Sequence, residues 1–378
     1  MTRRLAACLA LLAILAAGCG GNRTGQEPAS GSGPRLTPRA ERTLDAKLRD
    51  SFAVSGVPGV SAAIVFPDGR EWSGAAGAAV VETEQPMTAR TSLPLDSVTK
   101  LATAALALRL VERERLRLDD PVRRWYPRWR GDRRATVRDL LGHTAGTRDP
   151  GDRFFLRIIG RPRARATPRM LIAASPPPGP RTDEANYSNT GFAIAGAILQ
   201  RAAGEPVAAA MRDELFRHPG GDGLAFQPSE RAHVPRAHAY WYPSGGGDPV
   251  DAGDGGPLLP FRSYASAAGT AGALAGDVSS LARWAHELFA GRILEPASLR
   301  EMTRFHAGFI EGYGLGLARN SIDGRAMWGH PGDGLGSHTE LWHLPREHMT
   351  IAVAWNDDLL DDEAPFLPAL LRAALAAR

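Results

Sequence analysis

Cysteine is almost absent from this chain of 378 residues, which holds only Cys8 and Cys19. Cys8 falls inside an apolar run that we expect to be removed as an export signal, so the mature chain would keep Cys19 alone. A single cysteine excludes an internal disulfide and a metal site built from cysteine thiolates. The fold must therefore rest on a buried apolar core, for which 378 residues with 43% apolar content are sufficient.

Lysine is equally scarce, because Lys47 and Lys100 are the only two lysines among 45 basic residues. An arginine stays protonated at any accessible pH, whereas a lysine can lose its proton once burial or nearby positive charge lowers its pKa. Lys100 follows Ser97 in "SVTK". If a helix begins near Ser97, both side chains lie on one face and the partial positive helix N-terminus lies at the serine hydroxyl. The two residues are a candidate nucleophile and base, the alternative being a solvated helix lysine.

Three catalytic signatures are missing as well. The sequence contains no G-x-S-x-G, no H-E-x-x-H and no G-x-x-x-x-G-K. Their absence removes the sequence support for a triad hydrolase, a zinc peptidase and a P-loop enzyme. We expect no metal and no organic cofactor.

Nucleic-acid binding is also disfavoured, although the net charge is +4. The arginine-rich segment 157–169 has no interleaved aromatic residues, and other arginine clusters mix charges of both signs as a solvated helix does. We therefore expect no nucleic-acid partner. Attraction to an anionic cell envelope is the milder alternative.

The N-terminus has the pattern of an export signal. Two arginines precede the apolar segment 5–17, which is too short to span a bilayer as a permanent helix. It ends in "LAAGC", which resembles a bacterial lipobox, so we expect a signal peptide over 1–18 and a lipid on Cys19. Residues 19–38, rich in Gly, Ser and Pro, would form a flexible tether. The expected location is an exported lipoprotein at the cell surface or in the periplasm, with a plain secretory signal as the alternative.

The predicted fold class is α+β, an α/β sandwich in a single domain over 39–378. A helical pattern over 39–56 precedes a β-hairpin with the turn "PDGR", and "AMWGHPG", "SHTELWHLP" and "MTIAVAWN" are strand patterns before a C-terminal helix. Strands at both ends predict that the two ends pair in one antiparallel sheet flanked by the terminal helices. The middle, roughly 112–225, would be an inserted and mostly helical subdomain.

Three short motifs carry the chemistry: "SVTK" at Ser97, "YSN" at Tyr187 and "HPG" at His330. In this order and spacing they resemble the serine β-lactamase and penicillin-binding superfamily, in particular class C β-lactamases, D-alanyl-D-alanine carboxypeptidases and related esterases. "LLGHTAG", "GYGLGL" and "GHPGDGLGS" extend the resemblance from about residue 39 to the C-terminal helix. The resemblance implies a β-lactamase/transpeptidase-like fold and a serine hydrolase.

The resemblance also implies roles for individual residues. Ser97 would be the acylated nucleophile, activated by Lys100 with Tyr187. A desolvated lysine or a tyrosinate could accept the serine proton, and the sequence does not decide between them. Asn189 would hold the acyl side of the substrate, and the backbone N–H groups of Ser97 and Asp333 would bind the oxyanion.

The third motif adds His330 and Gly332 to the expected substrate site. His330 stands where β-lactamases usually carry a lysine, and its place in "GHPG" predicts that it faces the pocket. His143, in "LLGHTAG", matches a position that ends a helix and satisfies backbone groups, so we expect it to be structural.

Three departures from the family pattern bear on the substrate. Pro331 stands where relatives that bind a carboxylate often carry a hydroxyl, His330 should be neutral at pH 7, and Asp333 adds a negative charge. Such a wall should weaken carboxylate binding by about 1 kcal/mol or more. An arginine from "FRSYASAAGTAG" could still supply the missing cation.

The predicted function is accordingly that of an exported esterase or broad acyl hydrolase that forms an acyl-Ser97 intermediate. Its partner would be a small-molecule ester or an acyl-D-alanine-type substrate. The alternatives are a D-alanyl-D-alanine carboxypeptidase acting on peptidoglycan, and then a β-lactamase. A catalytically silent, penicillin-binding-like lipoprotein represents a different class of function.

Overall fold

Both ends of the chain contribute to one antiparallel sheet in the computed structural model, which describes residues 35–242, 249–360 and 364–377. Strand β1 (Gly59–Val65) pairs with β2 (Glu71–Val80) on one side and with β13 (Met349–Trp355) on the other. The predicted pairing of the N- and C-terminal parts is therefore confirmed. Cys19 and the expected signal peptide lie outside the described residues.

The main sheet has eight strands in the order β3-β2-β1-β13-β12-β11-β10-β9. Its remaining strands are β3 (Gln85–Pro86), β9 (Gly312–Tyr313), β10 (Ala318–Ile322), β11 (Arg325–Gly334) and β12 (Ser337–Leu344). A second sheet joins β4 (Leu93–Pro94), β8 (Leu274–Gly276) and β5 (Leu224–Phe226), and a third joins β6 (Tyr240–Trp241) to β7 (Val250–Asp251).

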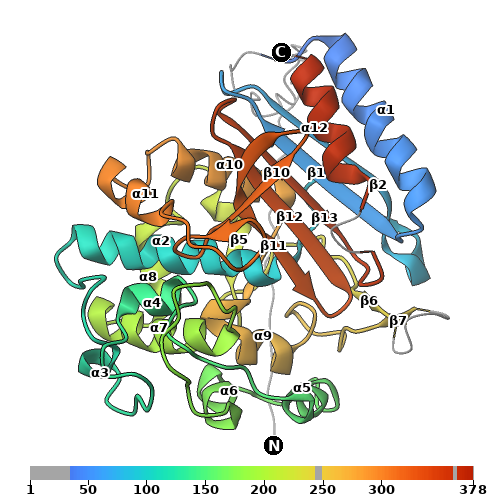
Figure 1. Cartoon of the computed structure of the whole chain (residues 1–378). Coiled ribbons are helices and arrows are strands. Elements are labelled where there is room, and N and C mark those ends of the chain that lie inside the picture. The colour runs from blue at the N-terminus through green and yellow to red at the C-terminus, as the bar shows by residue number, and fades with distance from the viewer. Residues whose placement is uncertain (1–34, 243–248, 361–363, 378) are drawn as a thin grey trace, which may run out of the picture. The chain divides into compact units, whose positions relative to one another are not determined.

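The two terminal helices pack together on one face of the main sheet (Figure 1). Helix α1 (Pro38–Ser55) begins where the Thr37 hydroxyl accepts a hydrogen bond from the Ala40 amide, and it ends at Gly56, whose φ of 77° suits a glycine. Helix α12 (Phe366–Ala376) follows the last strand. The predicted flanking helices are thus confirmed.

The other helices lie on the opposite side of the sheet, with α10 (Val278–Phe289) packed on β1 and β13 (Figure 1). The helices between the sheet-forming ends are α2 (Thr99–Glu112), α3 (Val122–Trp125), α4 (Val137–Leu141), α5 (Asp152–Ile159), α6 (Pro168–Ala174), α7 (Asn189–Ala203), α8 (Val207–Glu214), α9 (Arg262–Ala268) and α11 (Pro296–Met302). Helices α3 to α8 fall within 112–225, the segment that we propose as the insertion. Among the described residues, no helix is long and apolar enough to cross a membrane.

Helix α2 is buried nearly all round rather than on one side. The side chains of residues 99–108 and Leu110 are all buried, because helices and strands from distant parts of the chain surround them. A 3₁₀ turn, η2 (Asp96–Val98), precedes the helix and carries Ser97. Lys100 is 0% exposed, which contradicts the alternative of a solvated lysine.

Candidate active site

Ser97, Lys100 and Tyr187 meet through their side chains, although they come from η2, α2 and the segment before α7. The Lys100 Nζ donates hydrogen bonds to Ser97 Oγ at 2.9 Å, to Asn189 Oδ1 at 2.8 Å and to the Ala271 carbonyl at 2.7 Å. The Tyr187 hydroxyl donates to Ser97 Oγ at 2.8 Å. The serine oxygen therefore lies within hydrogen-bond reach of both candidate bases.

Burial shifts the pKa values of the two candidate bases in opposite directions. Desolvation lowers the pKa of Lys100 to about 7, although the negative charges of Asp149, Asp96 and Asp333 oppose the shift. Desolvation also raises the pKa of Tyr187 far above its usual value, against the opposing hydrogen bond to Ser97. Near neutral pH the lysine can thus be neutral while the tyrosine keeps its proton, which favours Lys100 as the base.

Asp149 anchors the start of α7. Its role in the site was not predicted from the sequence. Its carboxylate accepts hydrogen bonds from the Ser188 hydroxyl at 2.8 Å, from the Asn189 amide N–H and side chain at 2.9 and 3.0 Å, and from the Thr190 amide at 2.8 Å. A carboxylate at a helix N-terminus is favourable because it satisfies free N–H groups. Asn189 accepts a hydrogen bond from Lys100 through Oδ1 and donates one Nδ2 hydrogen to Asp149. Its second Nδ2 hydrogen can therefore bind a substrate.

His143 lies directly after α4 and supports the same segment. Its Nδ1 accepts a hydrogen bond from the Ser188 amide at 3.2 Å, and its ring lies 4.4 Å from the Tyr187 ring, centroid to centroid. Desolvation holds its pKa well below the usual value, so the ring is neutral and Nδ1 can accept. These contacts agree with the structural role expected from the sequence.

His330 does not reach the substrate site, contrary to the sequence prediction. Its ring is 0% exposed and lies 6.0 Å from the Tyr187 ring between centroids. The Nδ1 donates to the Pro331 carbonyl at 2.5 Å, so Nε2 accepts from the Tyr313 hydroxyl at 2.9 Å. Desolvation lowers its pKa to about 3, which agrees with the expected neutral state. Its contacts make His330 a packing residue behind Tyr187.

Gly332 brings β11 against the turn that carries the nucleophile. A Cβ atom at this position would lie 2.5 Å from the Leu95 carbonyl oxygen and 3.4 Å from Val98 Cγ2, so a larger residue would push the strand away. This approach is compatible with the expected use of the Asp333 and Ser97 amides as oxyanion donors.

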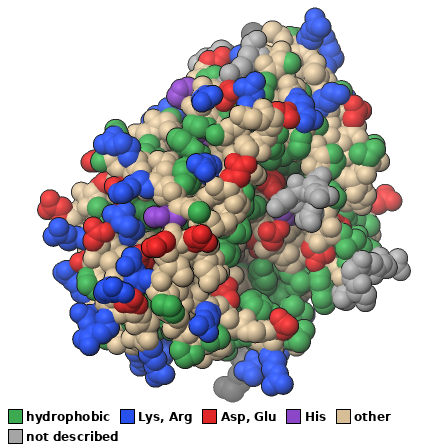
Figure 2. All heavy atoms as spheres, viewed as in Figure 1, with side chains coloured by type: hydrophobic (Ala, Val, Ile, Leu, Met, Phe, Trp, Pro, Cys, Tyr) green, Lys and Arg blue, Asp and Glu red, His purple; other side chains and the backbone are tan. Residues whose placement is uncertain are grey.

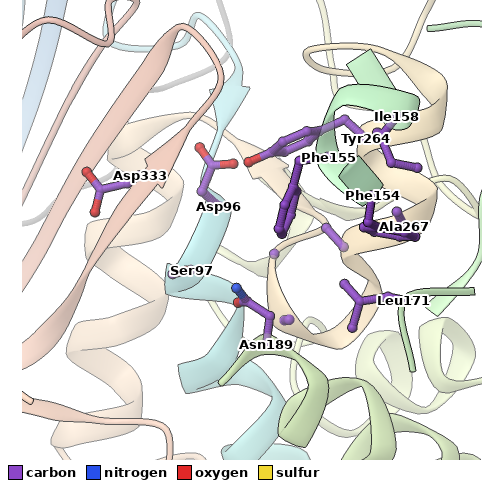
Figure 3. Close-up of a pocket in the computed structure, with 13 residues that line it drawn as sticks. Asp96, Ser97, Phe154, Phe155, Ile158, Leu171, Asn189, Tyr264, Ala267 and Asp333 are labelled. Atoms are coloured by element: carbon purple, nitrogen blue, oxygen red, sulfur yellow. The ribbon is translucent and has the colours of Figure 1, made fainter. Parts of the chain in front are cut away.

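The side chains of Pro331 and Asp333 do not form the wall that the sequence analysis placed beside Ser97. Side chains alternate along a strand, so these two lie on the opposite face of β11 from Gly332. Pro331 lines a separate cavity with Trp342 and Trp355. The Asp333 carboxylate points away from Ser97 in Figure 3 and pairs with His338 Nδ1 at 2.6 Å.

Asp333 shares the imidazole of His338 with Glu340, which pairs with its other nitrogen at 2.9 Å. Burial opposes a charge on the His338 imidazole, but its hydrogen bonds to Asp333 and Glu340 raise its pKa to about 10. His338 is therefore protonated at neutral pH. The prediction that the side chains of Asp333 and Pro331 form a wall beside Ser97 is therefore wrong.

An apolar cavity opens beside Ser97 and Asn189 (Figure 3). Its volume is about 90 Å³, enough for a small apolar group. The apolar part of its wall comes from α5, α6, α9 and the residues that follow, and consists of Phe154, Phe155, Ile158, Leu171, Ala267, Ala268 and Ala271. Because it adjoins the nucleophile, this cavity is suited to the acyl part of a substrate.

Asp96 is a buried acidic group in the wall of this cavity, which Asp333 also lines. It is 2% exposed, its backbone φ of 43° is left-handed, and its Oδ2 accepts a hydrogen bond from the Ser337 hydroxyl at 3.0 Å. Within the described residues its Oδ1 has no hydrogen-bond partner. Burial raises the pKa of Asp96 to about 7, against the opposing bond from Ser337. In Figure 3 its carboxylate and the Tyr264 hydroxyl point toward each other.

No cation balances Asp96 in the cavity wall. Among the described residues that line the cavity there is no lysine, arginine or histidine. Arg262, the arginine of "FRSYASAAGTAG", is exposed and does not line it. A substrate carboxylate would therefore meet an unfavourable environment, because Asp96 and Asp333 both line the cavity. The described residues also contain no cluster suited to a metal ion.

The family model described as Beta-lactamase matches residues 44–376. A D-aminopeptidase of Brucella anthropi is 26% identical over 289 residues, which cover 74% of this chain and 52% of that protein. Esterase EstB of Burkholderia gladioli is 30% identical over 243 residues, which cover 58% of each protein.

The chain thus spans only about half the length of these curated relatives, at 52% and 58%. Among solved structures, a D-stereospecific amidohydrolase from Streptomyces sp. superposes with a TM-score of 0.75 at 26% identity, covering 87% of this chain and 98% of that one. A likeness along the whole of a solved chain supports the β-lactamase/transpeptidase-like fold.

Proposed function

This chain belongs to the beta-lactamase family of serine hydrolases, and on that premise we propose that it hydrolyses small esters through an acyl intermediate on Ser97. One observation carries the proposal. Ser97 Oγ lies 2.9 Å from Lys100 Nζ and accepts a hydrogen bond from the Tyr187 hydroxyl at 2.8 Å, and the lysine is fully buried with a pKa of about 7. A buried, neutral amine beside a serine hydroxyl is what nucleophilic catalysis needs.

In the proposed reaction, neutral Lys100 takes the Ser97 proton while Ser97 Oγ attacks the carbonyl carbon of the ester. The backbone N–H groups of Ser97 and Asp333 hold the oxyanion of the tetrahedral intermediate. Its collapse breaks the bond to the alkoxide, which receives the proton from Lys100 with the Tyr187 hydroxyl as the relay. Water then attacks the acyl carbon and gives its proton to Lys100, and as the acid leaves, Lys100 passes that proton to Ser97 Oγ.

The cavity supports a substrate whose acyl group is apolar and carries no carboxylate. Its wall is largely apolar, and Asp96 disfavours a second anion. This charge pattern argues against a penicillin or a peptide ending in D-alanine, so the carboxypeptidase and β-lactamase alternatives rank below the esterase. The buried Lys100 also argues against a catalytically silent binding protein, since burying an amine is costly without a function for it.

A second candidate is an amidase for acyl groups that carry an ammonium group next to the carbonyl. The buried carboxylate of Asp96, in a wall without cations, favours it because such an ammonium could neutralise that carboxylate. The D-aminopeptidase of Brucella anthropi and the Streptomyces amidohydrolase are relatives of this kind by name. Esterase EstB is the relative that supports the first candidate.

Export and membrane anchoring are part of the proposal, and "LAAGC" is the feature that supports them. A signal peptide over residues 1–18 and a lipid on Cys19 would hold the catalytic domain outside the cytoplasm by the tether over 19–38. Labelling with a fatty-acid probe tests the lipid, since Cys19→Ala should abolish the label and persistent label would contradict the assignment.

Turnover of p-nitrophenyl butyrate tests the catalytic proposal. Ser97→Ala should lower kcat/KM by about a thousandfold or more, because the nucleophile is lost. Ser73→Ala is the matched control, since Ser73 is an exposed serine on β2. Equal turnover by wild type and Ser97→Ala would overturn the proposal.

A further inference from the structure

Positive charge is concentrated in one part of the chain. Residues 123–201 hold 16 arginines and 6 acidic residues, a net charge of +10, while the whole chain has a net charge of +4. The rest of the chain is therefore net negative. Such asymmetry points to an anionic partner for the positive part.

The arginines nearest the active-site cavity lie on and between α5 and α6. Six of them are exposed: Arg153, Arg157, Arg161, Arg163, Arg165 and Arg169. In the part of the chain that the structure describes, none of the six forms an ion pair with an acidic residue. In Figure 2, lysine and arginine side chains gather along the left and lower sides of the visible face. Unpaired, exposed arginines can bind external phosphate groups.

Large apolar side chains are exposed among these arginines. Leu156 is 65% exposed, Met170 41% and Phe155 37%. They are three of the nine large apolar residues that are exposed in the described ranges. A cluster of apolar residues ringed by arginines is the composition of a protein surface that binds at a lipid interface.

Helix α5 carries exposed arginine and apolar side chains on its outer side, and its inner side lines the cavity. With 100° of rotation per residue, Arg153, Leu156 and Arg157 share the side opposite the buried Ile158. Ile158 and Phe154 line the cavity beside Ser97. In Figure 1, α5 and α6 lie at the lower end of the view, far from α1 and α12. The same helix therefore forms one wall of the cavity and part of the arginine-rich surface.

We propose that residues 152–170, the α5–α6 surface, dock on an anionic phospholipid membrane. The arginines bind lipid phosphates, while Leu156 and Met170 enter the boundary between headgroups and acyl chains. Docking would hold the acyl cavity close to the lipid surface. The proposal depends neither on the lipid at Cys19 nor on the esterase reaction.

Vesicle binding by the full-length chain carrying Cys19→Ala tests the proposal without an acyl anchor. Flotation compares vesicles of phosphatidylcholine alone with vesicles in which about a third of the lipid is phosphatidylglycerol. The test variant is R153Q/R157Q/R161Q. The matched control is R39Q/R42Q/R49Q, which removes the same charge from exposed positions on α1, beyond the other face of the sheet.

The chain should bind only the anionic vesicles. The α5–α6 triple variant should bind about a hundredfold more weakly, at about fivefold per arginine, and the α1 control should lose less than about threefold. Leu156→Gln should weaken binding about tenfold by removing an apolar contact. Unchanged turnover of a soluble ester shows that each variant is folded, since none of these residues lines the cavity.

Three results would overturn the proposal. The first is an absence of binding to anionic vesicles, and the second is an equal loss in the two triple variants, which would mean unspecific charge attraction. The third is tight binding of soluble polyphosphate with no effect of Leu156→Gln, which would identify a polyanion site rather than a membrane site.

Discussion

Replacing Lys100 by arginine tests whether a neutral amine is the base. With a pKa of about 7, Lys100 is neutral in about half of the molecules at pH 7. A guanidinium stays protonated at any accessible pH, so Lys100→Arg should lower kcat/KM by about 10²- to 10⁴-fold, the usual loss for a general base. Lys47→Arg, at an exposed position on α1, is the matched control and should change nothing.

The wild-type pH profile tests the same reasoning without a mutation. Because protonated Lys100 cannot accept the serine proton, kcat/KM for a neutral ester should rise tenfold per pH unit below pH 7 and level off above it. The negative charge of Asp149 raises the pKa of Lys100, so Asp149→Asn should move this acid limb to lower pH. A flat profile from about pH 5 to 9, or a shift to higher pH in Asp149→Asn, would refute Lys100 as the base.

Three further predictions concern charge. Asp96→Asn should weaken the preference for a phenylalanine ester over a 3-phenylpropionate ester, which lacks the amine, by about tenfold in kcat/KM; an unchanged ratio would exclude Asp96 as the ammonium partner. Benzylpenicillin should leave no adduct on Ser97 in an intact-mass measurement, and a persistent adduct would revive the carboxypeptidase alternative. His338 has a pKa of about 10 when folded and about 6.5 when unfolded, so it contributes stability in full below pH 6.5 and loses it as pH rises toward 10. That contribution is at most about 5 kcal/mol, and in urea titrations His338→Gln should lose this part of the pH dependence; an identical dependence in both proteins would contradict the assignment.

Local signals account for the parts of the fold that the sequence predicted well. The helical pattern over 39–56 predicted α1, which ends at a glycine, and the turn "PDGR" joins β1 to β2. Strand patterns at both chain ends predicted their pairing. The near-complete burial of α2 was not predictable in this way, because elements distant in sequence create its surroundings.

The catalytic side chains were found through motif order, whereas their supporting groups were missed. Asp149 and His338 act through contacts with residues far along the chain or across a strand pair, and no short motif marks them. Asp96 was overlooked although it adjoins Ser97, because its role depends on burial.

The wrong placement of Pro331 and Asp333 beside Ser97 could have been avoided from the sequence. In a strand, alternate residues face opposite sides, so Pro331 and Asp333 could not share a wall with Gly332. Applying that alternation to "HPGD" would have turned both side chains away from the nucleophile. The full burial of His330, in contrast, depends on Tyr313 and Phe309, which the sequence does not place beside it.

The central claim is a covalent acyl group on Ser97. Rapid acid quenching of the enzyme during turnover of p-nitrophenyl butyrate, followed by intact-mass and peptide analysis, measures it directly. The account predicts one butyryl group on the peptide that contains Ser97 and none in Ser97→Ala. An unmodified enzyme under steady turnover, or the same adduct in Ser97→Ala, would contradict it.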